Sequence, residues 1–194
     1  MLPDYRAFCD QLLAAGRDAT EAPALAAGAE ILPTMMVWSI DVGDWPRALE
    51  LAEHVIRLHV PLPARYERDA ATLVLEEIAE AAFKVQDRGD SFPLDVLEQV
   101  AELTDAIDMH DQPRAKLARA IGFELAREAA MLESGTPAFI DAASAALMML
   151  QRAQQLHDRI GVKTKIKRLE KALAAAPAGT DQTDTSTEQS GTAG

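Results

Sequence analysis

Cysteine is almost absent from this chain of 194 residues, in which Cys9 is the single one. A lone cysteine cannot build a disulfide framework, so we expect a reducing compartment such as the cytoplasm. Because Cys9 follows Phe8 within a helical pattern, we expect a small core residue rather than a nucleophile.

Long apolar runs are also missing, since no stretch reaches the ~18 residues that a membrane-spanning helix needs. The first residues lack the basic-then-apolar order of a secretory signal peptide. The histidines have no zinc-ligand spacing and no cysteine pairs beside them. The segment from Gly161 to Thr164 echoes the end of a phosphate loop, but the upstream glycine and a preceding strand are lacking. We therefore expect no membrane contact, no metal site and no cofactor.

Large apolar residues are missing from residues 177–194, which are rich in Thr, Ser, Gly and Ala with scattered acids. Such a segment cannot bury enough surface to offset the entropy of ordering it. We predict a disordered tail over 177–194, which follows a single folded unit over 1–176.

Positive charge is scarce, with 19 Lys and Arg against 31 Asp and Glu and a net charge of −12 at pH 7. Proteins that bind nucleic acid normally carry a basic face, because neutralising phosphates supplies most of the non-specific affinity. The composition therefore argues against tight DNA binding by this chain alone. One segment departs from this trend, and its basic residues are Arg159, Lys163, Lys165, Lys167, Arg168 and Lys171. They are candidate contacts with a DNA backbone or with an acidic face of a neighbouring subunit. The alternative is that they complement a helix dipole and aid solubility.

Aromatic residues make up only 5% of the chain, whereas hydrophobic residues reach 48%, with alanine and leucine dominant. This composition favours helices, because alanine and leucine lose little on entering one. Apolar residues recur with the helical period, for example from Ala48 to His59, and no alternating pattern indicates a sheet. We predict an all-α fold of about seven to eight helices. They should span about 4–15, 20–42 with an interruption or kink at Pro33, 45–59, 67–87, 93–107, 111–133, 137–159 and 162–173.

A helix-breaking pattern recurs along the chain. Gly43, Gly89 and Gly135 lie 46 residues apart, and a proline that can open a helix follows each within four residues. Units of this size suit stacked antiparallel helical hairpins. The segment after Gly43 also resembles the second helix of a tetratricopeptide-type hairpin. The alternative is that helix breakers recur in any helical protein.

Two further features are candidate sites. Glu76 and Glu80 lie one helical turn apart with Glu77 beside them, and metal-dependent nucleases need several converging carboxylates. Such a run is more often the solvated face of a helix, which is the interpretation we favour. Trp45 is a candidate partner contact, because tryptophan is enriched at binding hot spots. The alternative is that Trp45 locks a hairpin at its turn.

Several short words of the sequence occur in the order seen in one known family. They are Met36-Val37-Trp38, Ile40-Asp41-Val42-Gly43-Asp44, Ala48-Leu49-Glu50-Leu51-Ala52, Leu62-Pro63, Glu76-Glu77, Ala79-Glu80-Ala81-Ala82, Ala101-Glu102-Leu103-Thr104, Asp111-Gln112-Pro113-Arg114-Ala115-Lys116-Leu117, Gly161-Val162-Lys163 and Ile166-Lys167-Arg168-Leu169-Glu170. By these words, over roughly residues 30–173, the chain resembles the small terminase subunit of P2-like tailed phages.

The resemblance implies a late phage protein of DNA packaging that works in the host cytoplasm. It would assemble with itself, help to recognise packaging-site DNA and regulate the large terminase subunit. Members of the family look longer at the N-terminus, where a basic helix-turn-helix-like segment is expected to contact DNA. This chain alone is therefore expected to bind phage DNA weakly.

The family is sometimes labelled a terminase endonuclease subunit, although the ATPase and the nuclease are expected in the large subunit. We favour a non-catalytic role. Two alternatives stay open. One is a metal-dependent endonuclease that cuts the packaging (cos) site, and the other is a helical-repeat adaptor unrelated to packaging.

Overall fold

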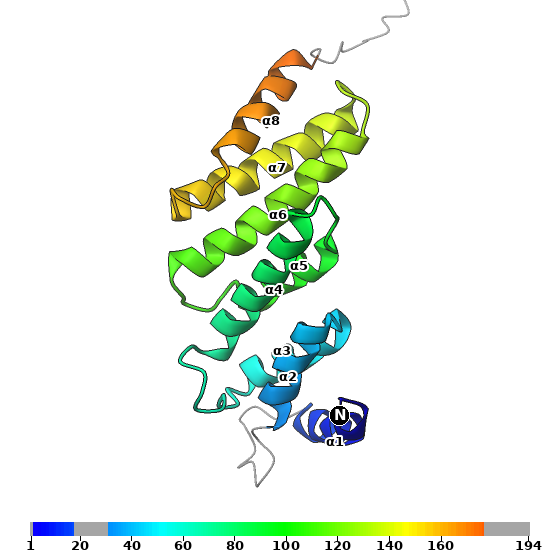
Figure 1. Cartoon of the computed structure of the whole chain (residues 1–194), viewed down its shortest axis with the longest axis vertical. Coiled ribbons are helices and arrows are strands. Elements are labelled where there is room, and N and C mark those ends of the chain that lie inside the picture. The colour runs from blue at the N-terminus through cyan, green and yellow to red at the C-terminus, as the bar shows by residue number, and fades with distance from the viewer. Residues whose placement is uncertain (1, 18–30, 177–194) are drawn as a thin grey trace, which may run out of the picture.

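Helices make up the regular structure of the described residues (Figure 1). The structure is a computed structural model that describes residues 2–17 and 31–176. Within these two ranges it contains eight α-helices and no strand, which confirms the all-α prediction. Their bounds are α1 Leu2–Gly16, α2 Ile31–Val42, α3 Trp45–Arg57, α4 Ala70–Gln86, α5 Leu94–Thr104, α6 Asp111–Met131, α7 Pro137–Leu156 and α8 Lys163–Ala175. In the part of the chain that is described, no helix is both long and apolar enough to span a membrane. The predicted helix start near residue 20 and the predicted tail over 177–194 fall outside the described residues.

The repeated glycines lie in the turns between the two helices of each hairpin. Gly43 joins α2 to α3, Gly89 joins α4 to α5 and Gly135 joins α6 to α7, with φ angles of 76°, 88° and 87°. This left-handed backbone strains residues that carry a Cβ, so the turns favour glycine. A proline then stands at the start of α3, α5 and α7, where its missing N–H costs nothing. The hairpin prediction is confirmed. The tetratricopeptide likeness stays a prediction. The 46-residue spacing of the glycines counts against it, because that repeat has ~34 residues.

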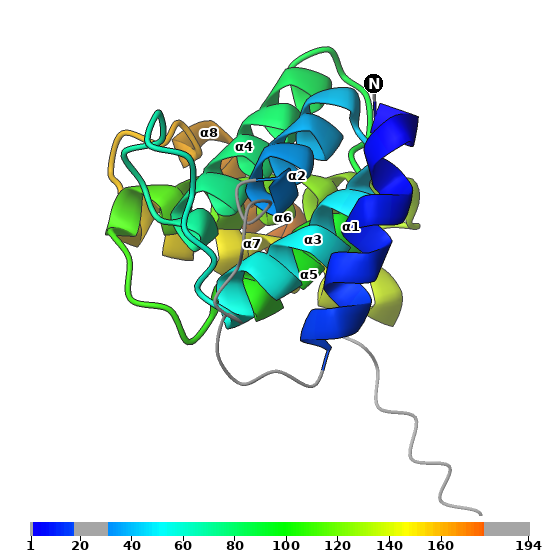
Figure 2. The ribbon, with the colours of Figure 1, turned by 90° about the horizontal axis from the view of Figure 1, so that it is seen from below.

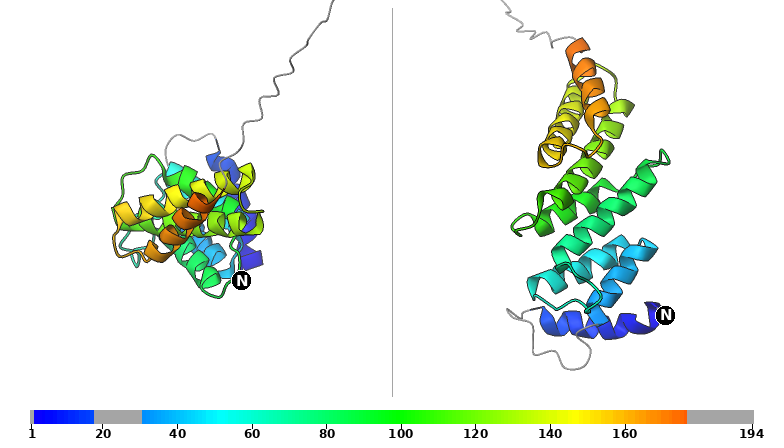
Figure 3. Two further views of the ribbon diagram at one scale, coloured as in Figure 1. Left: turned by 90° about the horizontal axis from the view of Figure 1, so that it is seen from above. Right: turned by 60° about the vertical axis from the view of Figure 1, so that its left-hand side comes forward.

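The hairpins stack along one axis into an elongated body. The α1 helix lies beside α2 and α3 at one end, and α8 packs on α7 at the other (Figures 1 and 3). Viewed from below, α2 and α4 lie on one side of the stack, and α3 and α5 on the other (Figure 2). In agreement with this view, α2 contacts α4 and α3 contacts α5. Surfaces near the two ends of the body are therefore far from each other.

The start of α4 is set by a side-chain cap. The carboxylate of Asp69 accepts hydrogen bonds from the N–H and the hydroxyl of Thr72, at 2.9 and 2.7 Å. Such a cap satisfies an N–H group that the helix itself leaves unpaired. The sequence pattern predicted a start near Glu67. Because of this cap, the helix begins at Ala70 instead.

Two predictions near α2 and α3 differ from the structure in detail. Pro33 does not interrupt α2, which begins two residues before it and continues to Val42, and a kink there stays a prediction. At the other end of the hairpin, α3 stops at Arg57, and His59 is exposed with a φ angle of 50°. His59 therefore does not extend the apolar stripe of α3. The chain turns there instead, and the N–H of Val60 bonds back to the carbonyl oxygen of Val55 at 2.9 Å.

The core consists of two clusters of buried side chains. The larger one joins α1 to α5 with the first half of α6, and the smaller one joins the second half of α6 with α7 and α8. Gly122 lets α6 and α7 approach closely, because a Cβ there would lie 2.5 Å from Cδ2 of Leu150. Leu150 is fully buried in the smaller cluster. The second half of α6, α7 and α8 thus forms a tightly packed end of the body.

The α1 helix is fastened to α3 through its last turn. Gly16 packs so closely on the ring of His54 that a Cβ would lie 2.1 Å from Cε1. The guanidinium of Arg57 donates a hydrogen bond to the carbonyl oxygen of Gly16 at 2.9 Å. Cys9, on the same helix, is buried as predicted, and this burial raises the pKa of its thiol.

Acidification should weaken this attachment through His54. Burial, and then the positive charge of Arg57, lower the pKa of His54 below its ordinary value of 6.5. The unfolded chain therefore binds a proton that the folded chain resists, and stability falls as the pH drops below 6.5 towards the folded pKa. We expect the protection factors of the α1 amides, which divide the intrinsic exchange rate at each pH by the observed rate, to fall between pH 7.5 and pH 5.

The His54→Gln variant should lose this pH dependence, whereas His59→Asn, which changes an exposed histidine, should keep it. An equal pH response in wild type and His54→Gln would contradict the assignment.

Candidate interaction surfaces

The six basic residues predicted as one feature divide into inward and outward groups. Successive residues of a helix point about 100° apart, so basic residues spread along the whole of α8 point in several directions. Ile166 and Leu169 are buried on the inner face of α8, together with Val162 just before it. Lys163 pairs with Asp158 at 2.8 Å, in an exposed ion pair next to the turn between α7 and α8.

Lys165 points towards α6 rather than into solvent. Its ammonium lies 5.0 Å from the centre of the Phe123 ring, and Arg119 lies over the same ring at 4.8 Å. Burial, and then the positive charges of Arg168 and Arg127, lower the pKa of Lys165. Cation–π contacts of this kind are worth about 0.5–1 kcal/mol at exposed sites and more where water is excluded. Lys165 thus helps to hold α8 on α6, and its contact with DNA or a partner stays a prediction.

The remaining basic residues form an outward surface, which we call the basic face. The basic face consists of four exposed residues, Arg159, Lys167, Arg168 and Lys171. Three of them project from α8 and one from the turn before it. The basic face therefore lies at the α8 end of the elongated body (Figure 1).

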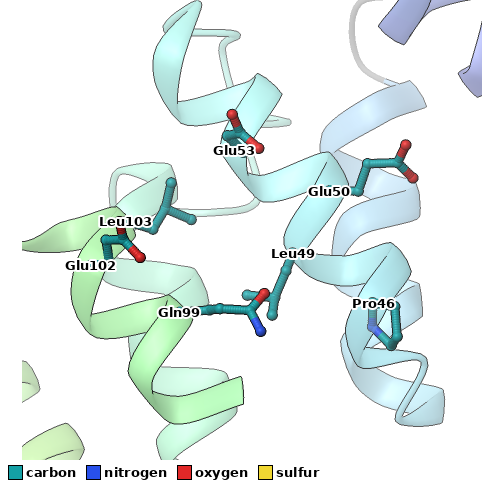
Figure 4. Close-up of a pocket in the computed structure, with 7 residues that line it drawn as sticks. All are labelled: Pro46, Leu49, Glu50, Glu53, Gln99, Glu102 and Leu103. Atoms are coloured by element: carbon teal, nitrogen blue, oxygen red, sulfur yellow. The ribbon is translucent and has the colours of Figure 1, made fainter. Parts of the chain in front are cut away.

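An acid-rimmed groove between α3 and α5 is a surface that the sequence reasoning missed. It has a volume of about 560 Å³ and is lined by Pro46, Leu49, Glu50, Glu53, Gln99, Glu102 and Leu103. Figure 4 shows Leu49 and Gln99 facing each other across the groove, with Glu53 and Glu102 on opposite helices. The groove thus combines an apolar floor with a negatively charged rim.

One buried cation lies behind this rim. The Arg47 side chain is only 10% exposed, and it pairs with Glu50 at 2.6 Å and with Asp10 at 2.7 Å. Its charge is balanced by these two carboxylates. Glu53 and Glu102 are exposed and keep the rim negative.

Trp45 lies half-buried at the start of α3. Its ring packs against Phe92 with a centroid distance of 5.0 Å, so part of the side chain joins the core. The next residue, Pro46, lines the groove. A contact between Trp45 and a partner stays a prediction.

Glu76 is buried, so the interpretation of residues 76–80 as a solvated face was wrong for this residue. Glu76 is 5% exposed and accepts a hydrogen bond from the ammonium of Lys116 at 3.0 Å, while Arg68 also pairs with it. The same ammonium donates to Glu80 at 2.8 Å. Burial, and then the charges of Glu80 and Asp41, raise the pKa of the half-buried Glu77. Cations from α6 and from the segment before α4 thus pair with Glu76 and Glu80.

The described ranges, 2–17 and 31–176, contain no group of three or more His, Cys, Asp or Glu side chains arranged to hold a metal ion. A two-metal nuclease centre needs several converging carboxylates. The carboxylates that do gather on α4 form ion pairs that link α4 to α6.

Comparison with known proteins identifies relatives. A family model described as "Phage small terminase subunit" matches residues 1–112. The protein named "Terminase, endonuclease subunit" from Escherichia phage P2 is 33% identical over 177 residues, which cover 91% of this chain and 64% of that relative. The chain thus spans slightly less than two thirds of the length of this relative. No solved structure matches the chain significantly.

Proposed function

This chain belongs to the phage small terminase subunit family, and we propose that it serves in phage DNA packaging as a non-catalytic assembly component. In this role it associates with further copies of itself and docks to the large terminase subunit, whose activity it regulates. It also helps to hold packaging-site DNA. Its place of action would be the host cytoplasm, where phage DNA is packaged.

The observation that carries this proposal is the stack of hairpins with two oppositely charged surfaces. Stacked hairpins present extended faces to neighbours, because each unit contacts only the next. Exposed charged patches steer and select partners more than they add affinity. The basic face and the acid-rimmed groove are both of this kind.

DNA contacts by this chain alone should be weak. The net charge is −12, and counterion release from phosphates requires several exposed cations on one surface. The basic face supplies four. We therefore place tight recognition of the packaging site in the whole assembly rather than in this chain.

The name of the P2 relative raises a second candidate, a metal-dependent endonuclease. This candidate is less well supported, because the acidic cluster of α4 is engaged in ion pairs with Lys116 and Arg68. A nuclease would need these carboxylates to be free for a divalent ion.

The proposal is tested with the large terminase subunit of the same phage. ATP hydrolysis by that subunit on packaging-site duplex DNA is measured with and without this chain, and with an unrelated acidic protein as control. We expect this chain to change the hydrolysis rate at stoichiometric amounts and to elute together with the large subunit. An unchanged rate without co-elution would contradict a packaging role.

A further inference from the structure

We propose that the basic face of one copy docks into the acid-rimmed groove between α3 and α5 of a second copy, so that copies join end to end. This inference rests on the self-assembly included in the proposed function and names the two surfaces that perform it.

The charges of the two surfaces are complementary. Glu53 and Glu102 are exposed on the groove rim, and Arg47 behind it is balanced by Asp10 and Glu50. The four residues of the basic face are exposed, and of the acids near it Asp158 pairs with Lys163, while Glu170 lines a pocket together with Lys167. Contact between such surfaces favours the correct register and disfavours groove-to-groove or face-to-face pairing, which would bring like charges together.

The shapes of the two surfaces also agree. The α8 helix has 13 residues, which corresponds to about 20 Å at 1.5 Å per residue. The groove is lined by residues 46–53 of α3 and 99–103 of α5, which correspond to about 12 and 8 Å of helix, so it can hold the part of α8 that carries Lys167 and Lys171. The aliphatic stems of Lys167 and Lys171 can cover the apolar floor at Leu49 and Leu103, while their ammonium groups reach the rim.

The positions of the surfaces exclude that one copy fills its own groove. The basic face lies at the α8 end of the body, whereas α3 packs against α1 and α2 at the other end (Figure 1). A contact between two different surfaces is heterologous, and repeating it gives a closed ring or an open chain. The occupant of the groove is therefore a second copy.

The test uses two charge-reversal variants. Each variant alone should lose self-association, and a mixture of the two should regain it. The groove variant is Glu53→Lys with Glu102→Lys, and the face variant is Lys167→Glu with Lys171→Glu. We expect wild type to have a mass that is a multiple of 21.0 kDa by light scattering at low salt. Each variant alone should associate at least about tenfold more weakly, because like charges now meet. Mixing the two variants should restore the large mass, since each altered surface then finds a complementary one.

Matched controls change the same number of charges elsewhere on the surface. Glu128→Lys with Glu133→Lys alters exposed acids of α6 and the following turn, and it should leave the mass unchanged. A wild-type mass of 21.0 kDa at every concentration would overturn the inference. Full assembly by either variant alone would do so too.

DNA is the competing occupant of the basic face. If the face variant loses binding to duplex DNA but keeps the full mass, the basic face serves DNA and the inference is wrong. Measuring ATP hydrolysis by the large subunit with the same variants distinguishes a failure of this docking from a failure of the packaging role. A monomeric chain that still regulates the large subunit would end this inference and leave the packaging role in place.

Discussion

Replacing Lys116 by methionine should lower the free energy of unfolding by about 3 kcal/mol, as expected when one partner of a buried ion pair is removed. Lys116 reaches from α6 to α4, where its ammonium pairs with Glu76 and Glu80. Glu76 is only 5% exposed, so without Lys116 its carboxyl group loses its best-buried partner in a poorly solvated place. The remaining partner, Arg68, has a 56% exposed side chain, and water screens its attraction.

The control for this variant is Arg68→Met, which removes the exposed partner of the same carboxylate. It should cost less than about 1 kcal/mol, because exposed ion pairs contribute little. Denaturant titration gives both values. Equal costs for Lys116→Met and Arg68→Met would contradict the assignment of Lys116 as the group that balances Glu76.

Replacing Leu150 by alanine should also destabilise the chain by about 3 kcal/mol, within the range for large-to-small changes in a core. Leu150 of α7 is fully buried in the smaller core cluster, next to Gly122 of α6, and the helices around it cannot close the cavity completely. The α8 helix, which carries the basic face, packs on the same cluster. We therefore expect self-association to weaken in this variant as well.

A double variant makes this prediction sharper. In the wild-type chain, Gly122→Ala should destabilise by about 1–2 kcal/mol, because its Cβ would overlap Leu150 at 2.5 Å. In the Leu150→Ala background the overlaps with Cδ2 and Cγ are removed, and the backbone nitrogen of residue 150 remains close at 3.3 Å. The same change should therefore cost clearly less in that background. An equal Gly122→Ala effect in both backgrounds, in the midpoint of denaturant unfolding, would contradict this packing.

The sequence predicted the hairpins well because their turns depend on local chemistry. Gly43, Gly89 and Gly135 adopt left-handed φ angles that other residues avoid, and a proline opens each following helix. Helix bounds were less accurate where a side chain decides them. Asp69 caps α4, which begins three residues after its predicted start, and periodicity alone does not show which acid near a helix start will be the cap.

The surfaces were harder to predict because they depend on how the hairpins pack. Glu53 and Glu102 lie 49 residues apart and meet only because α3 and α5 are neighbours in the stack. Glu76 is buried because Lys116, 40 residues later, provides its counter-charge. The basic segment was recognised from its composition, but composition does not show which way each side chain points. In the structure, Lys165 points towards α6 and contacts Phe123. Helical spacing could have separated Lys165 from Lys167, since adjacent turns of α8 have a clear apolar face.

The central claim is that this chain acts through its surfaces and not by cutting DNA. The most direct test is to incubate the purified chain alone with packaging-site duplex DNA and Mg²⁺ or Mn²⁺, together with calorimetric titration of each ion. We predict intact DNA and no stoichiometric binding of either ion. Metal-dependent cleavage that is lost in a folded Glu80→Gln variant, with one or two ions bound per chain, would contradict the claim and make the chain a nuclease.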